Sequence, residues 1–147
     1  MIIRPAHPYE APALKQVTLA AKQFWGYDSE WMTRWGNLVR ITPEYLEQHH
    51  AYIADEASVI LGWYAIEEHG PVAELGHLWV VPERIGSGIG RALWTHALEQ
   101  ARTLGAKQME LEADTHAEGF YQHMGARRVR MVKTEMERML PIMVVDL

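Results

Sequence analysis

The chain has no cysteine, no excess of basic residues and no long apolar run. Without cysteine there is no disulfide framework, no thiolate metal site and no cysteine nucleophile, which is compatible with a reducing cytoplasm. The net charge of −5 gives no general attraction to nucleic acid or to an anionic membrane. The longest apolar stretch, near residues 59–66, is much shorter than a membrane span, and residues 2–5 turn polar at once instead of forming a secretory leader. We therefore expect a cytoplasmic protein that binds neither nucleic acid nor membrane.

Internal repeats, low-complexity tracts and Ser/Gly linkers are also missing, so nothing in the sequence divides the chain. Of the 147 residues, 48% are hydrophobic, which is enough for one core. A chain of this length buries roughly 68–70% of its unfolded surface when it folds as one domain. The prediction is a single domain over residues 1–147.

The most informative stretch of the sequence is Val80 to Arg91, where an apolar strand passes through a glycine-rich turn into a helix. Gly86, Gly88 and Gly90 stand at alternate positions, so backbone N–H groups can converge on one point. The first turn of the helix adds free N–H groups and the positive end of its dipole. The stretch therefore predicts a phosphate or pyrophosphate site, although a structural tight turn explains such a sequence about equally well when it stands alone.

Hydrophobic periodicity along the rest of the chain predicts interleaved strands and helices. In the first helix, one face would consist of Ala13, Leu14, Val17, Ala20 and Ala21. This interleaving is typical of an α/β or α+β fold with helices on both faces of a sheet. We expect strands near residues 2–4, 51–54, 58–67, 73–81, 108–114, 128–133 and 142–146, and helices over residues 9–23, from Thr42 and Pro43, over 88–104, and from Thr115 or His116 to Gly125.

Neither common nucleotide motif matches the glycine-rich turn, because Arg91 stands where a dinucleotide fingerprint needs glycine and no Gly-Lys-Ser/Thr ending is present. A later motif, Phe120-Tyr121-Gln122-His123-Met124-Gly125, follows Asp114-x-x-Ala117. In this order and spacing, the motifs resemble those of the GNAT superfamily of acetyl-coenzyme A-dependent N-acetyltransferases. The resemblance covers most of the chain and is strongest over residues 74–126. It implies a mixed, mostly antiparallel central sheet flanked by helices on both faces.

The resemblance also implies how acetyl-CoA would bind. The glycine-rich turn would hold the pyrophosphate, Leu78 to Val80 would pair with the pantetheine arm as an added strand, and the Val80 N–H would be the oxyanion donor. Asp114 stands where family members often place Asn or Asp to contact the pantetheine or adenosine end, and His116 is near enough to do likewise. The alternative for both is to cap the short helix. One departure is Ile85, where the family usually has Gln or Arg. The predicted cofactor-binding residues are Leu78, Trp79, Val80, Ile85, Gly86, Ser87, Gly88, Ile89, Gly90, Arg91, Asp114 and His116.

Acetylation of an amine requires a group that removes a proton. An alkylamine of pKa about 10.4 is protonated at pH 7, which withholds about 4.6 kcal/mol of nucleophile, and a positioned base typically contributes about 3–5 kcal/mol. Glu74, fourteen residues before Gly88, matches the position where many family members carry a general base; the alternative is a solvated carboxylate at a strand edge. By resemblance Tyr121 would protonate the departing thiolate while Phe120 faces the core. The alternative for Tyr121 is simple packing on the sheet.

The histidines do not have the spacing of a metal site, so no metal is predicted, and strand alternation would turn His77 away from Glu74. Trp25, Trp31 and Trp35 crowd the region that covers the acceptor groove in the family. They would form an aromatic wall around an amine, pack the first helices on the sheet, or make a homodimer contact. We expect direct acetyl transfer to the primary amine of a small molecule. The alternatives are acetylation of a protein N-terminus or lysine, and a noncatalytic acyl-CoA-binding module.

Overall fold

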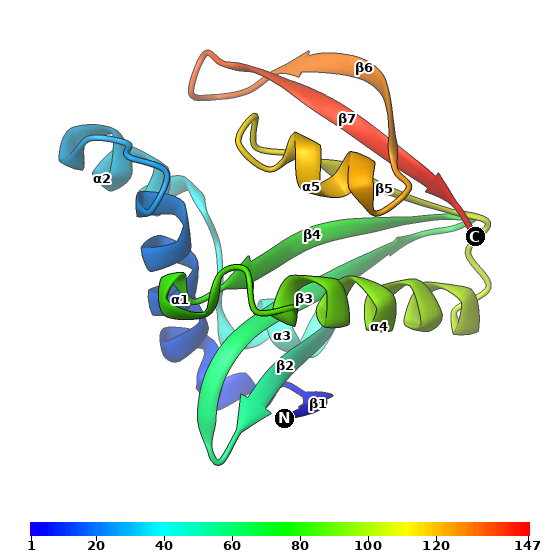
Figure 1. The fold of residues 1–147 in the computed structure, drawn as a ribbon, viewed down its shortest axis with the longest axis horizontal. Coiled ribbons are helices and arrows are strands. Elements are labelled where there is room, and N and C mark those ends of the chain that lie inside the picture. The colour runs from blue at the N-terminus through cyan, green and yellow to red at the C-terminus, as the bar shows by residue number, and fades with distance from the viewer.

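A mixed sheet of seven strands runs through the molecule in the order β1-β2-β3-β4-β5-β7-β6 (Figure 1). The computed structural model describes every residue from 1 to 147. Only the β4–β5 pair is parallel, and all the other neighbouring pairs are antiparallel, which confirms the predicted sheet type. The strands are β1 (Ile2–Pro5), β2 (His50–Glu56), β3 (Val59–His69), β4 (Val72–Val80), β5 (Gln108–Glu112), β6 (Arg127–Lys133) and β7 (Met139–Asp146).

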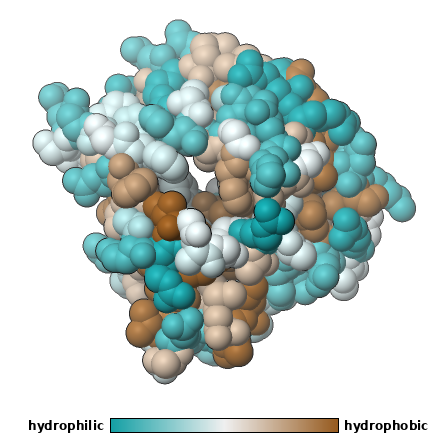
Figure 2. Space-filling model, in the orientation of Figure 1, coloured by the Kyte–Doolittle hydropathy of each residue, from teal (hydrophilic) through white to brown (hydrophobic).

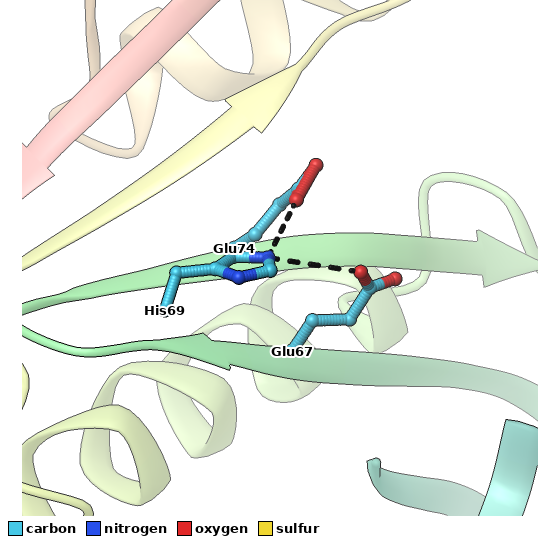
Figure 3. Close-up of side chains that lie close together, drawn as sticks. All are labelled: Glu67, His69 and Glu74. Atoms are coloured by element: carbon cyan, nitrogen blue, oxygen red, sulfur yellow. Dashed lines mark hydrogen bonds and ion pairs between the residues drawn. The ribbon is translucent and has the colours of Figure 1, made fainter. Parts of the chain in front are cut away.

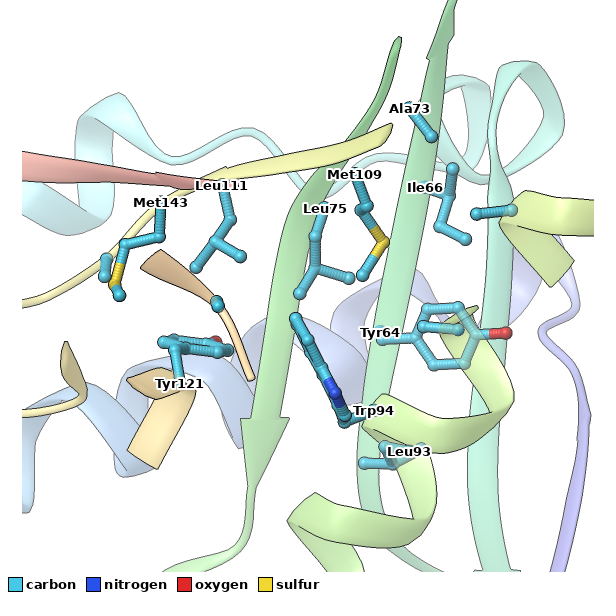
Figure 4. Close-up of a cluster of buried hydrophobic side chains, with 14 of the residues drawn as sticks. Tyr64, Ile66, Ala73, Leu75, Leu93, Trp94, Met109, Leu111, Tyr121 and Met143 are labelled. Carbon is cyan, nitrogen blue, oxygen red and sulfur yellow. The ribbon is translucent and has the colours of Figure 1, made fainter. Parts of the chain in front are cut away.

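Helices cover both faces of this sheet, as predicted. Alternate residues of β3 belong to different apolar clusters: Trp63 and Ala65 pack with residues of α1 and α3, whereas Tyr64 and Ile66 pack with residues of α4 and α5 (Figure 4). None of the helices is long and apolar enough to cross a membrane. The helices are α1 (Ala11–Gln23), α2 (Ser29–Leu38), α3 (Pro43–Gln48), α4 (Ile89–Thr103) and α5 (Glu118–His123), with 3₁₀ turns η1 (Pro8–Glu10) and η2 (Pro82–Arg84).

The buried face of α1 differs from the predicted one because two polar side chains have partners inside. Ala13 and Ala20, which were expected in the core, are exposed, whereas Thr18 and Lys22 are buried. The Thr18 hydroxyl accepts the indole N–H of Trp63 at 2.9 Å, so its burial leaves no polar atom unpaired. Sequence periodicity alone does not show such a partner.

α5 begins at Glu118, later than predicted, because a turn precedes it. The Asp114 side chain accepts the backbone N–H of His116, and the Asp114 carbonyl accepts that of Ala117, both at 2.8 Å. This turn uses the residues that were expected to open the helix. β5 likewise ends at Glu112, two residues earlier than predicted.

The sheet opens where β4 and β5 diverge. Their pairing covers only Val72–Glu74 of β4 against Gln108–Glu110 of β5, and beyond it β4 continues to Val80 without a partner on that side (Figure 1). Figure 2 shows a hollow near the middle of this face of the molecule, with hydrophobic and hydrophilic residues around it. The divergence therefore positions a cleft in the centre of the domain.

Candidate active site

A cavity of about 700 Å³ lies at this divergence, between α1 and α2, β4, the glycine loop (Gly86–Gly90), β5 and α5. The side chain of Ser87 is not part of its wall, since the Ser87 hydroxyl donates to the Arg84 carbonyl, and Ile89 is buried in the core. The structure brings the other predicted site residues to the wall, namely Glu74, Leu78, Trp79, Val80, Ile85, Gly86, Gly88, Gly90, Arg91, Asp114, His116 and Tyr121.

The glycine loop has the geometry of an anion site. Gly86 and Gly88 adopt φ of +84° and +89°, which L-residues rarely adopt, and no atom lies within 4 Å of the place where either would carry a Cβ. Ala92 makes the first hydrogen bond of α4, from its N–H to the Gly88 carbonyl at 3.0 Å, so the N–H groups of residues 89–91 have no acceptor in the protein. These N–H groups and the start of a fifteen-residue helix favour a bound phosphate.

The unpaired side of β4 offers backbone donors to the same cavity. The Val81 N–H points toward β3, because it donates to the Leu61 carbonyl at 2.9 Å. Peptide groups alternate in direction along a strand, so the N–H groups of Leu78 and Val80 point away from β3, into the cleft. An extended ligand can therefore pair with this side of β4 as an additional strand.

A bulge at Gly76 interrupts the alternation of β4. Ala65 of β3 pairs with His77 and the next residue, Ile66, pairs with Leu75, so Gly76 is the extra residue. The bulge places His77 on the same face of the sheet as Glu74, where its ring stacks on Trp63 at 4.7 Å. The prediction that His77 faces away from Glu74 is therefore wrong, because it assumed a regular strand.

His77 is held as a neutral hydrogen-bond donor. The indole N–H of Trp79 donates to His77 Nδ1 at 2.9 Å, and an indole nitrogen can only donate, so the proton of the neutral imidazole is on Nε2. Burial, with a small effect from His49, lowers the pKa of His77 to about 4. His77 is therefore not a base in this arrangement, and its Nε2–H is the group that it can offer to a ligand.

Two carboxylates of the cavity wall, those of Glu67 and Glu74, lie close to the imidazole of His69 (Figure 3). His69 Nε2 lies 3.2 Å from Glu74 Oε2 and 3.9 Å from Glu67 Oε1. One oxygen of each carboxylate and one ring nitrogen of His69 all lie within 4.8 Å of one another. Their side chains differ in exposure, from 55% for His69 and 43% for Glu74 to 23% for Glu67. Glu67 is the most buried of the three, and its Oε2 accepts the hydroxyl of Tyr45 at 2.6 Å.

Tyr121 lies deeper than the sequence suggested. Its side chain belongs to the main core (Figure 4), yet it also lines the cavity, and its hydroxyl makes no hydrogen bond within the protein. Burial, together with the nearby charge of Asp114, raises the pKa of Tyr121 above its ordinary value. The expectation that Phe120 faces the core was only partly right, because Phe120 is half-buried and packs over Gly90 at the glycine loop.

Aromatic residues of α2, of the loop before it and of β4 surround a cation that the protein itself supplies. The ammonium group of Lys22 lies among four rings, which we call the aromatic box: Tyr27 at 5.4 Å, Trp31 at 5.7 Å, Trp35 at 4.9 Å and Trp79 at 5.8 Å from the ring centroids. Trp25 stacks instead on His116, at 5.2 Å. Trp25 and Trp35 also line the cavity. The box lies beside the cavity and is filled by Lys22.

Asp114 is the counter-ion of Lys22 and has little capacity for another ligand. Its Oδ2 accepts from Lys22 at 2.5 Å and from the Tyr27 hydroxyl at 2.8 Å, while Oδ1 accepts the backbone N–H and the Nδ1 of His116, both at 2.8 Å. Burial alone would raise the pKa of Asp114, but Lys22 and the other donors hold it well below its usual range. Burial lowers the pKa of Lys22, an effect that Asp114 opposes. Four donors fill both carboxylate oxygens. Asp114 does not cap α5 either, because Ala117 is the N-cap residue and has no side-chain capping bond; Asp114 instead holds the turn before the helix.

The sequence did not single out three features of this site: Lys22, the bulge at Gly76, and the Tyr45–Glu67 pair. A glycine inside an otherwise regular strand pattern is a signal for a bulge and could have drawn attention to Gly76. Lys22 and Glu67 carried no comparable signal, because their partners are 92 and 22 residues away in the chain.

Comparison with known families agrees with this geometry. The model of the acetyltransferase (GNAT) family matches residues 15–126, which include most of α1, the glycine loop and α5. The chain belongs to the GNAT family. This confirms the resemblance drawn from the sequence, and with it the prediction of an acetyltransferase that uses acetyl-CoA.

The relatives of this GNAT chain differ widely from it in sequence, and the solved structures among them share its fold. A mycothiol acetyltransferase of Thermobispora bispora is 32% identical over 87 residues, which are 52% of this chain and 30% of that protein. The PaiA N-acetyltransferase of Thermoplasma acidophilum, solved with coenzyme A, superposes with a TM-score of 0.82 at 18% identity over 99% of this chain and 98% of that one. A GCN5-related N-acetyltransferase of Rhodopseudomonas palustris gives a TM-score of 0.84 at 21% identity, over 99% and 95%. The chain thus spans less than a third of the mycothiol acetyltransferase and nearly all of the two solved structures.

Proposed function

We propose that this GNAT protein transfers the acetyl group of acetyl-CoA directly to the primary amine of a small molecule. The observation that carries the proposal is that one cavity joins an anion site, an unpaired strand edge and carboxylates. The glycine loop and the Leu78–Val80 edge lie on its cofactor side, and Glu67 and Glu74 lie on the other. A carboxylate both attracts an ammonium group and accepts its proton.

The residues of the cofactor side fit coenzyme A. The free N–H groups at the start of α4 would bind its pyrophosphate, with positive charge from Arg84 and Arg91, which also line the cavity. The N–H groups of Leu78 and Val80 would pair with the pantetheine arm and bind the thioester oxygen. Bound acetyl-CoA supplies an activated acetyl group, whose C–S bond breaks as a C–N bond to the amine forms.

Proton movement falls to the protein's own side chains. An ammonium substrate loses two protons on becoming an amide; one ends on the coenzyme A thiol and one in solvent. Glu74 would accept a proton on the amine side, as the sequence suggests. Tyr121 would give a proton to the leaving sulfur, and its raised pKa keeps it protonated and able to donate at neutral pH.

Contacts across the cleft favour a small acceptor over a protein segment. Lys22 of α1 and Tyr27 both bond Asp114, and Arg34 of α2 donates to the Glu135 carbonyl of the β6–β7 hairpin at 2.8 Å. These contacts join the N-terminal helices to the β5–β7 side and narrow access from that direction. A volume near 700 Å³ is within the usual range for small-molecule sites.

The first test is calorimetric titration of the purified protein with acetyl-CoA, with NAD and ATP as controls, followed by a coenzyme A release assay. The acceptors would be 1,4-diaminobutane, tryptamine, and peptides with a free N-terminus or an internal lysine. Selective binding of acetyl-CoA and turnover of the free amines would support the proposal. Turnover of the peptides alone would favour a protein acetyltransferase, and binding without any turnover would favour a noncatalytic acyl-CoA-binding module.

A further inference from the structure

We propose that Glu67, held by Tyr45 in the space that Gly76 leaves open, is the carboxylate that takes the proton from the acceptor amine. This inference rests on the proposed acetyl transfer and changes which residue performs its first step. Glu67 lies on β3, outside the strand that carries the base predicted from the sequence. Its assignment depends on three observations: the place of its carboxylate, the bond that holds it, and its route to solvent.

The carboxylate of Glu67 lies over the bulge of β4. A Cβ on Gly76 would be 2.5 Å from Glu67 Oε2 and 2.8 Å from the Tyr45 hydroxyl, so only glycine leaves room for this pair. Gly76 is two residues from Leu78, the first of the two donors on the cofactor side, whereas Glu74 is four residues away. The Glu67 carboxylate therefore lies further along β4 toward the cofactor side than the backbone of Glu74, with which Glu67 pairs across the strands. One side-chain oxygen of Glu67 still lies within 4.8 Å of one of Glu74.

The side chain of Glu74 is directed elsewhere. Its Oε2 bonds His69, the last residue of β3 before the β3–β4 turn, at 3.2 Å. With 43% of the side chain exposed, Glu74 lies at the mouth of the cavity, whereas 23% of Glu67 is exposed. Of the two carboxylates, Glu67 is therefore better placed to meet an amine beside the Leu78–Val80 edge.

Tyr45 fixes the orientation of Glu67. The Tyr45 hydroxyl donates to Oε2, and Oε1 has no hydrogen bond within the protein. Burial, and then the bond to Glu67, raise the pKa of Tyr45 above its ordinary value, so Tyr45 remains a donor throughout the neutral range. A carboxylate with one oxygen fixed by a neutral donor presents the other to a ligand, here the ammonium group of the acceptor.

His69 gives the proton a way out. It lies 3.9 Å from Glu67 Oε1 and is the most exposed of the three side chains in Figure 3. In the complete step, Glu67 takes one proton from the ammonium group and releases it through His69 to water. Nitrogen then forms the C–N bond as the C–S bond breaks, and the second nitrogen proton balances the one that the leaving sulfur receives.

The test compares Glu67→Gln with Glu74→Gln and with a matched control, Glu68→Gln. Glu68 is adjacent in sequence, exposed, bonded to His50 and absent from the cavity wall. With 1,4-diaminobutane and acetyl-CoA at pH 7, Glu67→Gln should lower kcat/KM by a factor of about 10²–10³. The difference in kcat/KM between wild type and Glu67→Gln should shrink as the pH approaches the pKa of the amine, because more of the amine is then already neutral in solution. Glu74→Gln should lower kcat/KM by less than tenfold, and Glu68→Gln should leave it unchanged.

A second readout does not depend on turnover. Calorimetric titration of the coenzyme A complex with 1,4-diaminobutane should show weaker binding for Glu67→Gln than for Glu68→Gln. Each variant loses one carboxylate charge, but only Glu67 lines the cavity where the amine would bind. Tyr45→Phe should lower kcat while KM for the amine changes little, because the carboxylate remains but is no longer oriented. The inference would be overturned if Glu67→Gln had the same kcat/KM and the same amine affinity as Glu68→Gln, or if only Glu74→Gln showed a large loss of kcat/KM. Either result would leave the proposed acetyl transfer unaffected. Wild-type protein that binds acetyl-CoA but acetylates no amine would overturn both.

Discussion

Replacing Asp114 by Asn should destabilise the protein more than any other single loss of charge at the site. The substitution leaves Lys22 buried without a counter-ion, and only 5% and 7% of the two side chains are exposed. Breaking a buried ion pair from one side typically costs about 3–5 kcal/mol. The asparagine amide also has only one acceptor oxygen, whereas the carboxylate accepts from four donors. Its NH₂ group would therefore face a donor of Lys22, Tyr27 or His116.

For a domain of this size, the loss corresponds to a fall in Tm of roughly 10–20 °C, measured by calorimetry or circular dichroism. Asp146→Asn is the matched control, because Asp146 is 67% exposed and its partners Arg127 and Gln108 are at the surface. It should leave Tm nearly unchanged. Equal Tm values for the two variants would refute the assignment of the Lys22–Asp114 pair as a buried structural contact.

A second variant separates lost charge balance from lost packing. Lys22→Met combined with Asp114→Asn removes both charges of the buried pair, and the unbranched methionine fits among the four rings of the aromatic box. The other cation near Asp114, Arg138 at 3.7 Å, is 22% exposed and loses less when the carboxylate is removed. The double variant should be more stable than Asp114→Asn alone. If the double variant lost as much stability as the two single variants together, the two residues would not be coupled.

The effect of Asp114 should also depend on pH in a defined direction. Its pKa in the folded protein is below that of the unfolded chain, so the unfolded state binds the proton more readily. The contribution to stability is therefore complete above about pH 5 and is lost as the pH falls through the pKa of the folded protein. The difference in unfolding free energy between wild type and Asp114→Asn should shrink at acid pH and stay constant between pH 6 and 8.

Further predictions concern the cofactor side and His77. Gly88→Ala and Gly105→Ala each place an L-residue at a left-handed φ with open space around the new Cβ, so each should cost about 1–2 kcal/mol. Only Gly88→Ala should weaken acetyl-CoA binding in calorimetry, and equal affinities would argue against the glycine loop as the phosphate site. Tyr121→Phe should lower kcat at least tenfold with acetyl-CoA affinity unchanged; an unaltered kcat would remove Tyr121 from the mechanism. Nitrogen NMR should find His77 protonated only on Nε2 at pH 7 and gaining its second proton near pH 4. Because that pKa is below the ordinary value, the unfolded chain binds the proton more tightly, so His77 should reduce stability as the pH falls below about 6.5.

The fold could be predicted from the sequence wherever one periodicity held along an element. The apolar positions of α4 follow the helical period from Ile89 to Ala101, and Gly105 ends the helix at φ +84°. Thr42 caps α3 with its side chain, as its place before Pro43 indicated. The predicted boundaries of an element were wrong where a side chain accepts a backbone N–H that a helix would otherwise use, as Asp114 accepts that of His116 before α5.

The site was predicted best where backbone geometry alone defines it. The glycine loop depends on φ angles, which leave a local signature in the sequence, whereas the unpaired edge of β4 was expected from the family resemblance. The amine side depends on contacts between distant side chains, such as Tyr45 with Glu67, and on a bulge that reverses which residues share a face. The family resemblance assigned Glu74 to this side from its position fourteen residues before Gly88, on the strand that leads to the glycine loop, and it gave no reason to consider β3.

The divergence of β4 and β5 leaves most of β4 as an open edge inside the sheet, in addition to the two outer edges. An open edge is a template on which another chain can pair, and the two outer edges discourage such pairing. β1 has only four residues and ends at Pro5, while β6 carries Arg127, Arg128, Arg130 and Lys133. The open edge of β4 needs no such protection, because it lies inside the molecule. The sheet of a neighbouring molecule cannot reach it there, whereas a single extended ligand such as the pantetheine arm can. The protein can thus keep the backbone groups of one strand edge unpaired and available to its ligand without exposing them to aggregation with other chains.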